Sequence, residues 1–111
     1  MLKKYLNKIV KVKIDRAKNS KHPKHGFVYP INYGYIENTV SGDGEEIDAY
    51  ILDEQNPVEY FEGRVVAIIH RLNDCEDKLV VAPICDKVYT KEEIIKQTYF
   101  QEQFFKSEII L

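Results

Sequence analysis

Residues 64–69 form a continuous apolar run behind one charged residue, Arg64-Val-Val-Ala-Ile-Ile69, and no other segment limits the possible folds as strongly. Such a short run of mainly β-branched residues is typical of a strand buried on both faces. The polar segment 72–78 separates it from a second apolar run, Leu79-Val-Val-Ala82. Two apolar runs joined by a polar turn predict a β-hairpin at the centre of a sheet.

Shorter segments before this hairpin also have strand patterns. Residues 9–14, Ile-Val-Lys-Val-Lys-Ile, alternate apolar and basic positions, as in a strand with one buried and one solvated face. Residues 27–29 and 33–36 are rich in aromatic side chains and are separated by a proline, which favours two short strands with a corner between them. After the turn at 41–44, residues 47–52 are predicted to form the next strand.

A single helix is predicted near the end of the chain. Thr90-Lys-Glu-Glu93 has the spacing of a capping box, so we expect a helix to start there and to continue to about Lys106. We expect its apolar residues to pack on the sheet, namely Ile94, Ile95, Tyr99, Phe100, Phe104 and Phe105. Segments 15–26 and 57–63 are predicted to be loops. Five or six short strands followed by one helix indicate a small barrel or curled sheet capped by the helix.

Length and composition limit the class of function. With 111 residues, the chain is expected to form a single domain over 1–111. A formal net charge of -2 argues against general affinity for nucleic acid. There is no apolar signal core at the start and no run near the ~18 residues of a membrane span, so we expect no membrane partner and a cytoplasmic location. The two cysteines fit reduced thiols, in keeping with that compartment.

Two acidic segments are candidates for a metal site. The first is Asp43-Gly-Glu-Glu-Ile-Asp48, and the second is Asp74-Cys-Glu-Asp77. Clustered carboxylates suit Mg²⁺, which also keeps several waters and phosphate oxygens as ligands. If both segments lie at one end of the sheet, they could hold metal ions that activate water for attack at phosphorus. The alternative interpretation is that each is a solvated surface turn.

Basic and phenolic side chains could complete such a site. Residues 1–26 are rich in Lys and Arg and contain a single acid, Asp15, which suits an anionic ligand. Lys78 and Arg16 could neutralise charge that develops on a transferred phosphoryl group. The hydroxyls of Tyr29 and Tyr33 could donate to phosphate oxygens in the same cavity. The three histidines share no spacing with other ligands, so no catalytic role is predicted for them.

The run Tyr29-Pro-Ile-Asn-Tyr-Gly-Tyr-Ile36, followed by Asp43-Gly-Glu-Glu-Ile-Asp48 and by residues 65–83, resembles the soluble family I inorganic pyrophosphatases. The similarity extends over roughly residues 14–83. It implies a mainly β fold, an OB-like five-stranded closed barrel with a C-terminal helix packed against it. It also implies Mg²⁺-dependent hydrolysis of diphosphate to two phosphates by metal-activated water, and a homo-oligomer.

The resemblance also implies roles for individual residues. The implied catalytic residues are Glu45, Asp48, Tyr33, Arg16 and Lys78, with Glu45 at the position of an aspartate that helps to activate water. The implied substrate-binding residues are Arg16, Tyr29, Tyr33 and Lys78. The implied metal ligands are Asp43 and Asp48, together with acids of the second segment. There, position favours Glu76 and side-chain chemistry favours Asp77, and our preferred pair is Asp74 and Asp77.

Departures from the family pattern leave a second hypothesis open. Glu45 is one methylene longer than the expected aspartate, and a tyrosine–lysine pair expected on the helix is replaced near Phe104, Phe105 and Lys106. The alternative is therefore a catalytically weak or inactive protein of the same fold that binds metal and phosphoanhydrides. A third interpretation, a single-strand nucleic-acid module, fits an OB-like barrel, but the acidic turns oppose it.

Overall fold

A computed structural model of the chain describes residues 2–40, 44–73 and 76–111. Its strands are β1 (Ile9–Arg16), β2 (Tyr33–Ile36), β3 (Ile47–Ile51), β4 (Tyr60–Arg71), β5 (Asp77–Ala82) and β6 (Ser107–Ile110). A short 3-10 helix, η1 (Leu2–Tyr5), precedes them, and the helix α1 (Lys91–Glu102) lies between β5 and β6. In the described part of the chain, no helix combines the length and apolar character needed to cross a membrane.

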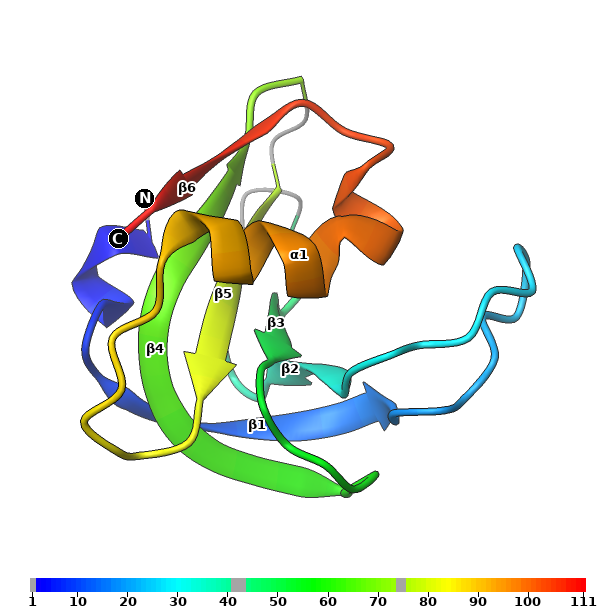
Figure 1. The fold of residues 1–111 in the computed structure, drawn as a ribbon, viewed down its shortest axis with the longest axis horizontal. Helices are drawn as coiled ribbons and strands as arrows, with labels where there is room; N and C mark the ends of the chain where they lie inside the picture. Colours follow the sequence, from blue (N-terminus) through cyan, green and yellow to red (C-terminus); the bar gives the residue numbers. More distant parts are fainter. Residues whose placement is uncertain (1, 41–43, 74–75) are drawn as a thin grey trace.

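The sheet closes into the predicted barrel. Its strands follow the order β1-β2-β3-β5-β4-β6, and β1 also pairs with β4, so five strands close on themselves while β6 extends the sheet beyond β4. The β3–β5 pair is parallel, and the other pairs are antiparallel. Figure 1 shows β4 curving around the barrel and α1 lying across one side of it. The mainly β, OB-like fold with a C-terminal helix is confirmed.

Strand β4 starts earlier than the sequence pattern indicates. The predicted loop 57–63 is wrong from Tyr60 onward, because Tyr60–Arg64 pair with Ile9–Lys13 of β1. A Cβ atom on Gly63 would lie 2.4 Å from the carbonyl oxygen of Ala82, so only glycine fits where β4 passes from β1 to β5. The glycine is thus part of a bent strand, although it resembles a loop residue in the sequence.

The central hairpin is buried on both faces, as predicted. Alternate residues of a strand point to opposite faces, and here each face has its own apolar cluster. One cluster contains Ile51 and Ile68, and the other contains Tyr50, Ile69 and Ile94 of α1. Strands β3, β4 and β5 therefore form a rigid support for the side chains at their ends.

Helix α1 begins as predicted but buries a different face. Both hydrogen bonds of the capping box between Thr90 and Glu93 are present. The helix ends at Glu102 instead of Lys106, and its buried residues are Ile94, Thr98 and Glu102. Of the residues predicted to pack on the sheet, Ile94 is buried and Phe100 packs against the core. The helix also buries Glu102, which was not predicted and which is stabilised by partners on the sheet.

Side chains expected in the core lie at the surface instead. Ile95, Tyr99 and Phe104 are 47%, 57% and 68% exposed. The residues after the helix form β6, a strand that the sequence pattern did not predict, on the edge of β4. The predicted strand at 27–29 is reduced to one isolated bridge between Val28 and Lys21.

Candidate functional site

Carboxylates from both acidic segments converge on one buried lysine. Lys78 of β5 donates from Nζ to Tyr33 Oη at 2.6 Å, to Asp48 Oδ2 at 2.9 Å and to Glu76 Oε1 at 2.6 Å. The register explains this, since Ala49 pairs with Leu79 and so brings Asp48 beside Lys78. We call these four residues the buried lysine cluster. Acids far apart in the sequence are thus brought within reach of a single cation.

The two carboxyl groups of this cluster interact directly. Burial and the hydrogen bond with Asp48 raise the pKa of Glu76. Burial acts to raise the pKa of Asp48 too, but the hydrogen bond with Glu76 and the Lys78 ammonium hold it below its ordinary value. Both carboxylates also contact Lys78 Nζ, so their oxygens lie close enough together to bind one divalent cation. The donor set therefore fits a hard cation such as Mg²⁺, which needs few protein carboxylates.

The neighbouring tyrosine remains a neutral donor. Burial and the adjacent Asp48 carboxylate raise the pKa of Tyr33 well above its usual value. Its hydroxyl, which already accepts from Lys78, can therefore donate its proton to an anionic oxygen. Tyr29 is also buried, and burial raises the pKa of its hydroxyl as well. Both phenols are suited to hydrogen bonding with phosphate.

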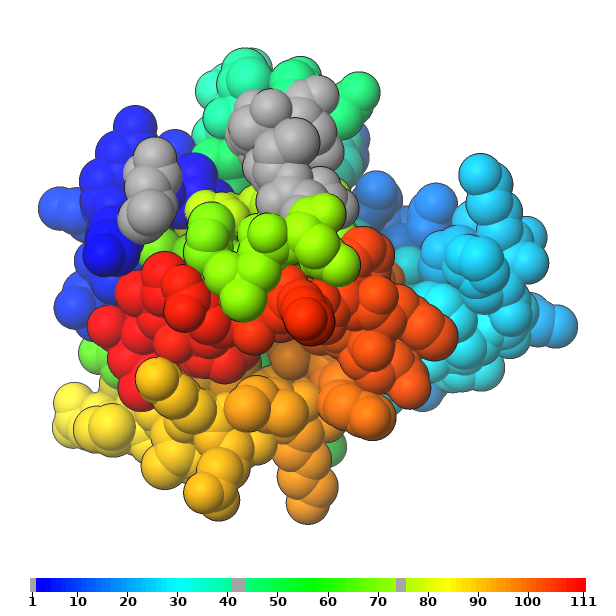
Figure 2. Space-filling view, turned by 90° about the horizontal axis from the view of Figure 1, so that it is seen from above, coloured from blue at the N-terminus to red at the C-terminus, as the bar shows by residue number. Residues whose placement is uncertain are grey.

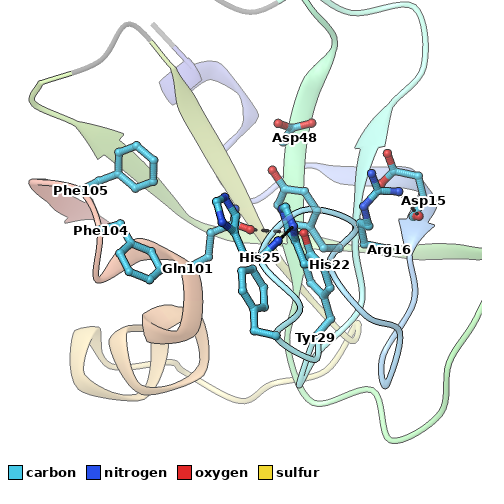
Figure 3. Close-up of a pocket in the computed structure, with 11 residues that line it drawn as sticks. Asp15, Arg16, His22, His25, Tyr29, Asp48, Gln101, Phe104 and Phe105 are labelled. Carbon is cyan, nitrogen blue, oxygen red and sulfur yellow. Dashed lines mark hydrogen bonds between the residues drawn. The ribbon is translucent and has the colours of Figure 1, made fainter.

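A cavity of about 830 Å³ opens beside the buried lysine cluster. Its polar end contains Asp15 and Arg16 from β1 and Asp48 from β3, as Figure 3 shows. Arg16 follows a register shift in β1, where Gly34 of β2 comes so close that a Cβ atom would lie 2.0 Å from the Lys13 carbonyl oxygen. The Arg16 guanidinium lies in the cavity wall, where Nη1 donates to the backbone carbonyl of Asp15 at 3.1 Å.

The rest of the cavity wall is largely aromatic. His22, His25 and Phe27 contribute from the loop before β2, and Phe104 and Phe105 contribute from the segment after α1. Figure 2 shows this loop, in light blue and cyan, beside the orange segment that follows the helix. The cavity therefore lies between two segments that are far apart in the sequence.

A second buried ion pair, between Arg71 and Glu102, lies next to the buried lysine cluster. The Arg71 guanidinium donates to Glu102 at 2.7 and 3.2 Å and lies 3.4 Å from Oε2 of Glu76. Tyr50 Oη also donates to Glu102 at 2.6 Å. The ring of Phe105 covers the guanidinium at 3.6 Å. Helix α1 is thus linked through Arg71 to a carboxylate of the buried lysine cluster.

The structure brings together most of the predicted site residues. Arg16, Tyr29, Tyr33 and Asp48 line the cavity, and Lys78 and Glu76 lie behind Asp48. Glu45 is exposed, just before β3. Asp43 and Asp74 lie outside the described residues.

Asp77 lies away from the other site residues. Its carboxylate is 2.7 Å from Nδ1 of His70 on the neighbouring strand. Successive residues of a strand point to opposite faces, so Asp77 cannot share the face of Lys78, whereas Glu76 can. The geometry therefore favours Glu76 over Asp77 as the acid of this site. In the part of the chain that the structure describes, no three His, Cys, Asp or Glu residues are grouped to hold a metal by themselves.

Sequence analysis did not identify several residues that line the cavity or pack beside the buried lysine cluster. His22 and His25 line the cavity, although their spacing matches no metal or catalytic motif. Arg71, the last residue of β4, was given no role from the sequence. Glu102 does leave a signal, because it lies in helical register with Ile94 and Thr98, which are both buried.

Comparisons with known proteins identify the family of the chain. A model of the inorganic pyrophosphatase family matches residues 5–109. The inorganic pyrophosphatase of Neisseria meningitidis serogroup A is 30% identical over 93 residues, covering 72% of this chain and 52% of that protein. The Picrophilus torridus inorganic pyrophosphatase is 29% identical over 108 residues, covering 86% of this chain and 56% of that protein. The chain thus spans about half the length of the curated relatives it matches.

Solved structures share the fold. The inorganic pyrophosphatase of Ehrlichia chaffeensis superimposes with a TM-score of 0.69 at 21% identity, covering 93% of this chain and 85% of that chain. The Helicobacter pylori inorganic pyrophosphatase gives a TM-score of 0.67 at 19% identity, covering 91% of this chain and 81% of that chain. At these identities the likeness is one of fold. Because the family match extends over most of the sequence, this chain belongs to the inorganic pyrophosphatase family.

Proposed function

We propose that the protein is an inorganic diphosphatase that hydrolyses diphosphate to two phosphates with Mg²⁺. The observation that carries this proposal is the convergence of Asp48, Glu76 and Lys78 beside a cavity that also presents Arg16. Acidic groups for a metal and basic groups for phosphate thus lie in one place. The names of the family and of its similar members support the same reaction.

The metal would be held by the paired carboxyl groups. We assign Asp48 and Glu76 as ligands because both carboxylates contact Lys78 Nζ, at 2.9 and 2.6 Å, and Asp48 lines the cavity. We retain Asp43 as a further proposed ligand. Bound Mg²⁺ supplies a water of lowered pKa and neutralises phosphate charge. Glu45 is the proposed acceptor of the proton from that water.

The cationic and phenolic groups would orient the substrate. Arg16 can hold one phosphoryl group through its guanidinium, which is suited to paired phosphate oxygens. The neutral hydroxyls of Tyr29 and Tyr33 can donate to further oxygens. Lys78 keeps a positive charge buried behind Asp48, where it stabilises negative charge more strongly than it would in water.

A phosphate-release assay with diphosphate and Mg²⁺ tests this proposal. We expect turnover by the pure protein and its loss in Asp48→Asn, because the amide lacks the anionic oxygen that a metal needs. The matched control is Asp86→Asn, at an exposed aspartate outside the cavity, which should keep wild-type turnover. Absence of turnover by the wild-type protein would refute the proposal.

One observation favours a second candidate, binding without efficient hydrolysis. Glu45 is exposed and is one methylene longer than the aspartate expected at its position. A general base displaced by about an ångström can cost ~10²-fold in rate. Calorimetric binding of Mg-diphosphate without phosphate release would select this candidate.

We also propose a homo-oligomer in the cytoplasm. Ile95 and Tyr99 leave apolar surface exposed on α1, which a second copy of the chain could cover. An exposed free thiol at Cys85 suits a reducing compartment. Light scattering on the purified protein would show the mass of an oligomer, and a monomer mass would contradict this assembly.

A further inference from the structure

The cavity offers more apolar surface than diphosphate can use. Its volume of about 830 Å³ lies within the range of ~300–1,000 Å³ typical of pockets for ligands of drug size. Inorganic diphosphate is anionic throughout and has no apolar part to contact an aromatic wall. The polar end alone, with Arg16 and Asp48, could hold such an ion.

Two rings of the aromatic wall, those of Phe104 and Phe105, stand opposite the polar end. Figure 3 shows Phe104 and Phe105 on the side of the cavity away from Asp15 and Arg16. Phe104 is 68% exposed, so its ring is open to a ligand. A molecule spanning the cavity would therefore meet charged groups at one end and rings at the other.

His22, which lies between Arg16 and these two rings in Figure 3, is held in a fixed orientation. Nδ1 of His22 accepts from the backbone N–H groups of Lys24 at 3.0 Å and His25 at 3.1 Å. The neutral ring therefore carries its proton on Nε2, which can act as a donor. The ring also packs on those of His25 and Phe27, each with its centroid 4.8 Å away. Such an ordered set of rings can stack with a planar group at little cost in side-chain entropy.

We propose that this cavity takes a phosphoanhydride that carries a planar aromatic group, a nucleoside 5′-diphosphate, with its base against the wall formed by His22, His25, Phe27 and Phe104. The inference rests on the proposed function and deepens it. Water adds to the terminal phosphorus, the bond from that phosphorus to the bridging oxygen breaks, and the bridging oxygen leaves with the nucleoside monophosphate. The products are nucleoside monophosphate, inorganic phosphate and one proton.

Calorimetry with AMP and ribose 5-phosphate tests the aromatic subsite. These two ligands differ only in the base, and neither has an anhydride bond that could be hydrolysed. We expect AMP to bind at least about tenfold more tightly, because each stacked base contributes measurably to affinity. Phe104→Ala should remove most of that difference, whereas Tyr99→Ala, at an exposed ring outside this cavity, should keep it. Thermal unfolding of both variants would show that the fold is intact.

Phosphate release from ADP and from diphosphate completes the test. We expect both to be hydrolysed, and we expect Phe104→Ala to lower kcat/KM for ADP more than for diphosphate. Equal affinities for AMP and ribose 5-phosphate would overturn this inference even if diphosphate is hydrolysed. No phosphate release from either compound would overturn the proposed function, and the AMP comparison would still decide the aromatic subsite.

Discussion

Within residues 2–40, 44–73 and 76–111, two clusters are built from the same four residue types. The buried lysine cluster joins Lys78 to Asp48, Glu76 and Tyr33. The surface lysine cluster joins Lys87 to Asp53 at 3.1 Å and Glu93 at 3.2 Å, and Tyr89 donates to Asp53 at 2.5 Å. The side chain of Lys78 is 3% exposed and that of Lys87 is 46% exposed.

Burial and position give these two clusters different consequences. Exposed ion pairs contribute about 0–1 kcal/mol to stability, because water screens the charges. Buried pairs are desolvated, so removing one partner leaves a costly charge behind. Asp48 of the buried lysine cluster also lines the cavity, whereas the surface lysine cluster ties the start of α1 to the end of β3. Residue type alone therefore does not distinguish a site from a surface contact.

The largest expected effect comes from Lys78→Met. It should lower kcat/KM for diphosphate about 10²–10³-fold, as expected when a buried group that stabilises developing charge is removed. Steady-state phosphate release measures this loss. The matched control is Lys87→Met, which should keep wild-type activity, and equal losses in the two variants would remove the functional distinction between the clusters.

Arg71→Met should cause the next largest effect, on stability. It leaves Glu102 buried beside Tyr50 without its cation, which typically costs about 3–5 kcal/mol. Urea denaturation measures the free energy of unfolding. The double variant Arg71→Met, Glu102→Met should recover part of the loss, because no buried charge is then left unpaired. A loss below about 1 kcal/mol in the single variant would show that this pair behaves like a surface pair.

Lys87→Met should change the free energy of unfolding by no more than about 1 kcal/mol. Its ammonium is half exposed and contacts two carboxylates that remain in water when it is removed. Urea denaturation in parallel with Arg71→Met gives a direct comparison. A loss as large as that of Arg71→Met would contradict the contrast between the two clusters.

The smallest expected effect is a pH dependence at the surface lysine cluster. Hydrogen bonds from Tyr89 and Lys87 lower the pKa of Asp53 below its ordinary 3.8. The ionised Asp53 carboxylate therefore contributes its full stabilisation of the folded state above pH 3.8. This contribution is lost as the pH falls through the lower pKa that Asp53 has in the folded state. The difference in unfolding free energy between wild type and Asp53→Asn should shrink below about pH 4. A difference that persists in acid would contradict the lowered pKa.

Local patterns predicted the parts of the fold that depend on neighbours in sequence. The capping box at Thr90 and the central hairpin were found because turn chemistry and apolar runs are short-range signals. The start of β4 was missed because Gly63 belongs to a close approach between strands that only the folded barrel creates. The buried position of Glu102 was missed because its partner, Arg71, lies on a distant strand.

The site was predictable in its residue types and less so in its geometry. The acidic segments and Lys78 stand out in the sequence, but only the register of β3 with β5 brings Asp48 to Lys78. The choice between Glu76 and Asp77 depends on strand alternation, since Glu76 lies two residues from Lys78 and contacts it. The aromatic wall could not be predicted, because the loop before β2 and the segment after α1 meet only in the folded chain.

The most direct test of the account is a crystal of the protein soaked with Mn²⁺ and phosphate. Manganese scatters anomalously and prefers the same oxygen ligands as Mg²⁺. We predict an anomalous peak coordinated by the carboxylates of Asp48 and Glu76, with phosphate beside Arg16. The proposed metal–phosphate site would be contradicted if manganese were well occupied only at other positions while Asp48 and Glu76 kept their hydrogen bonds with Lys78.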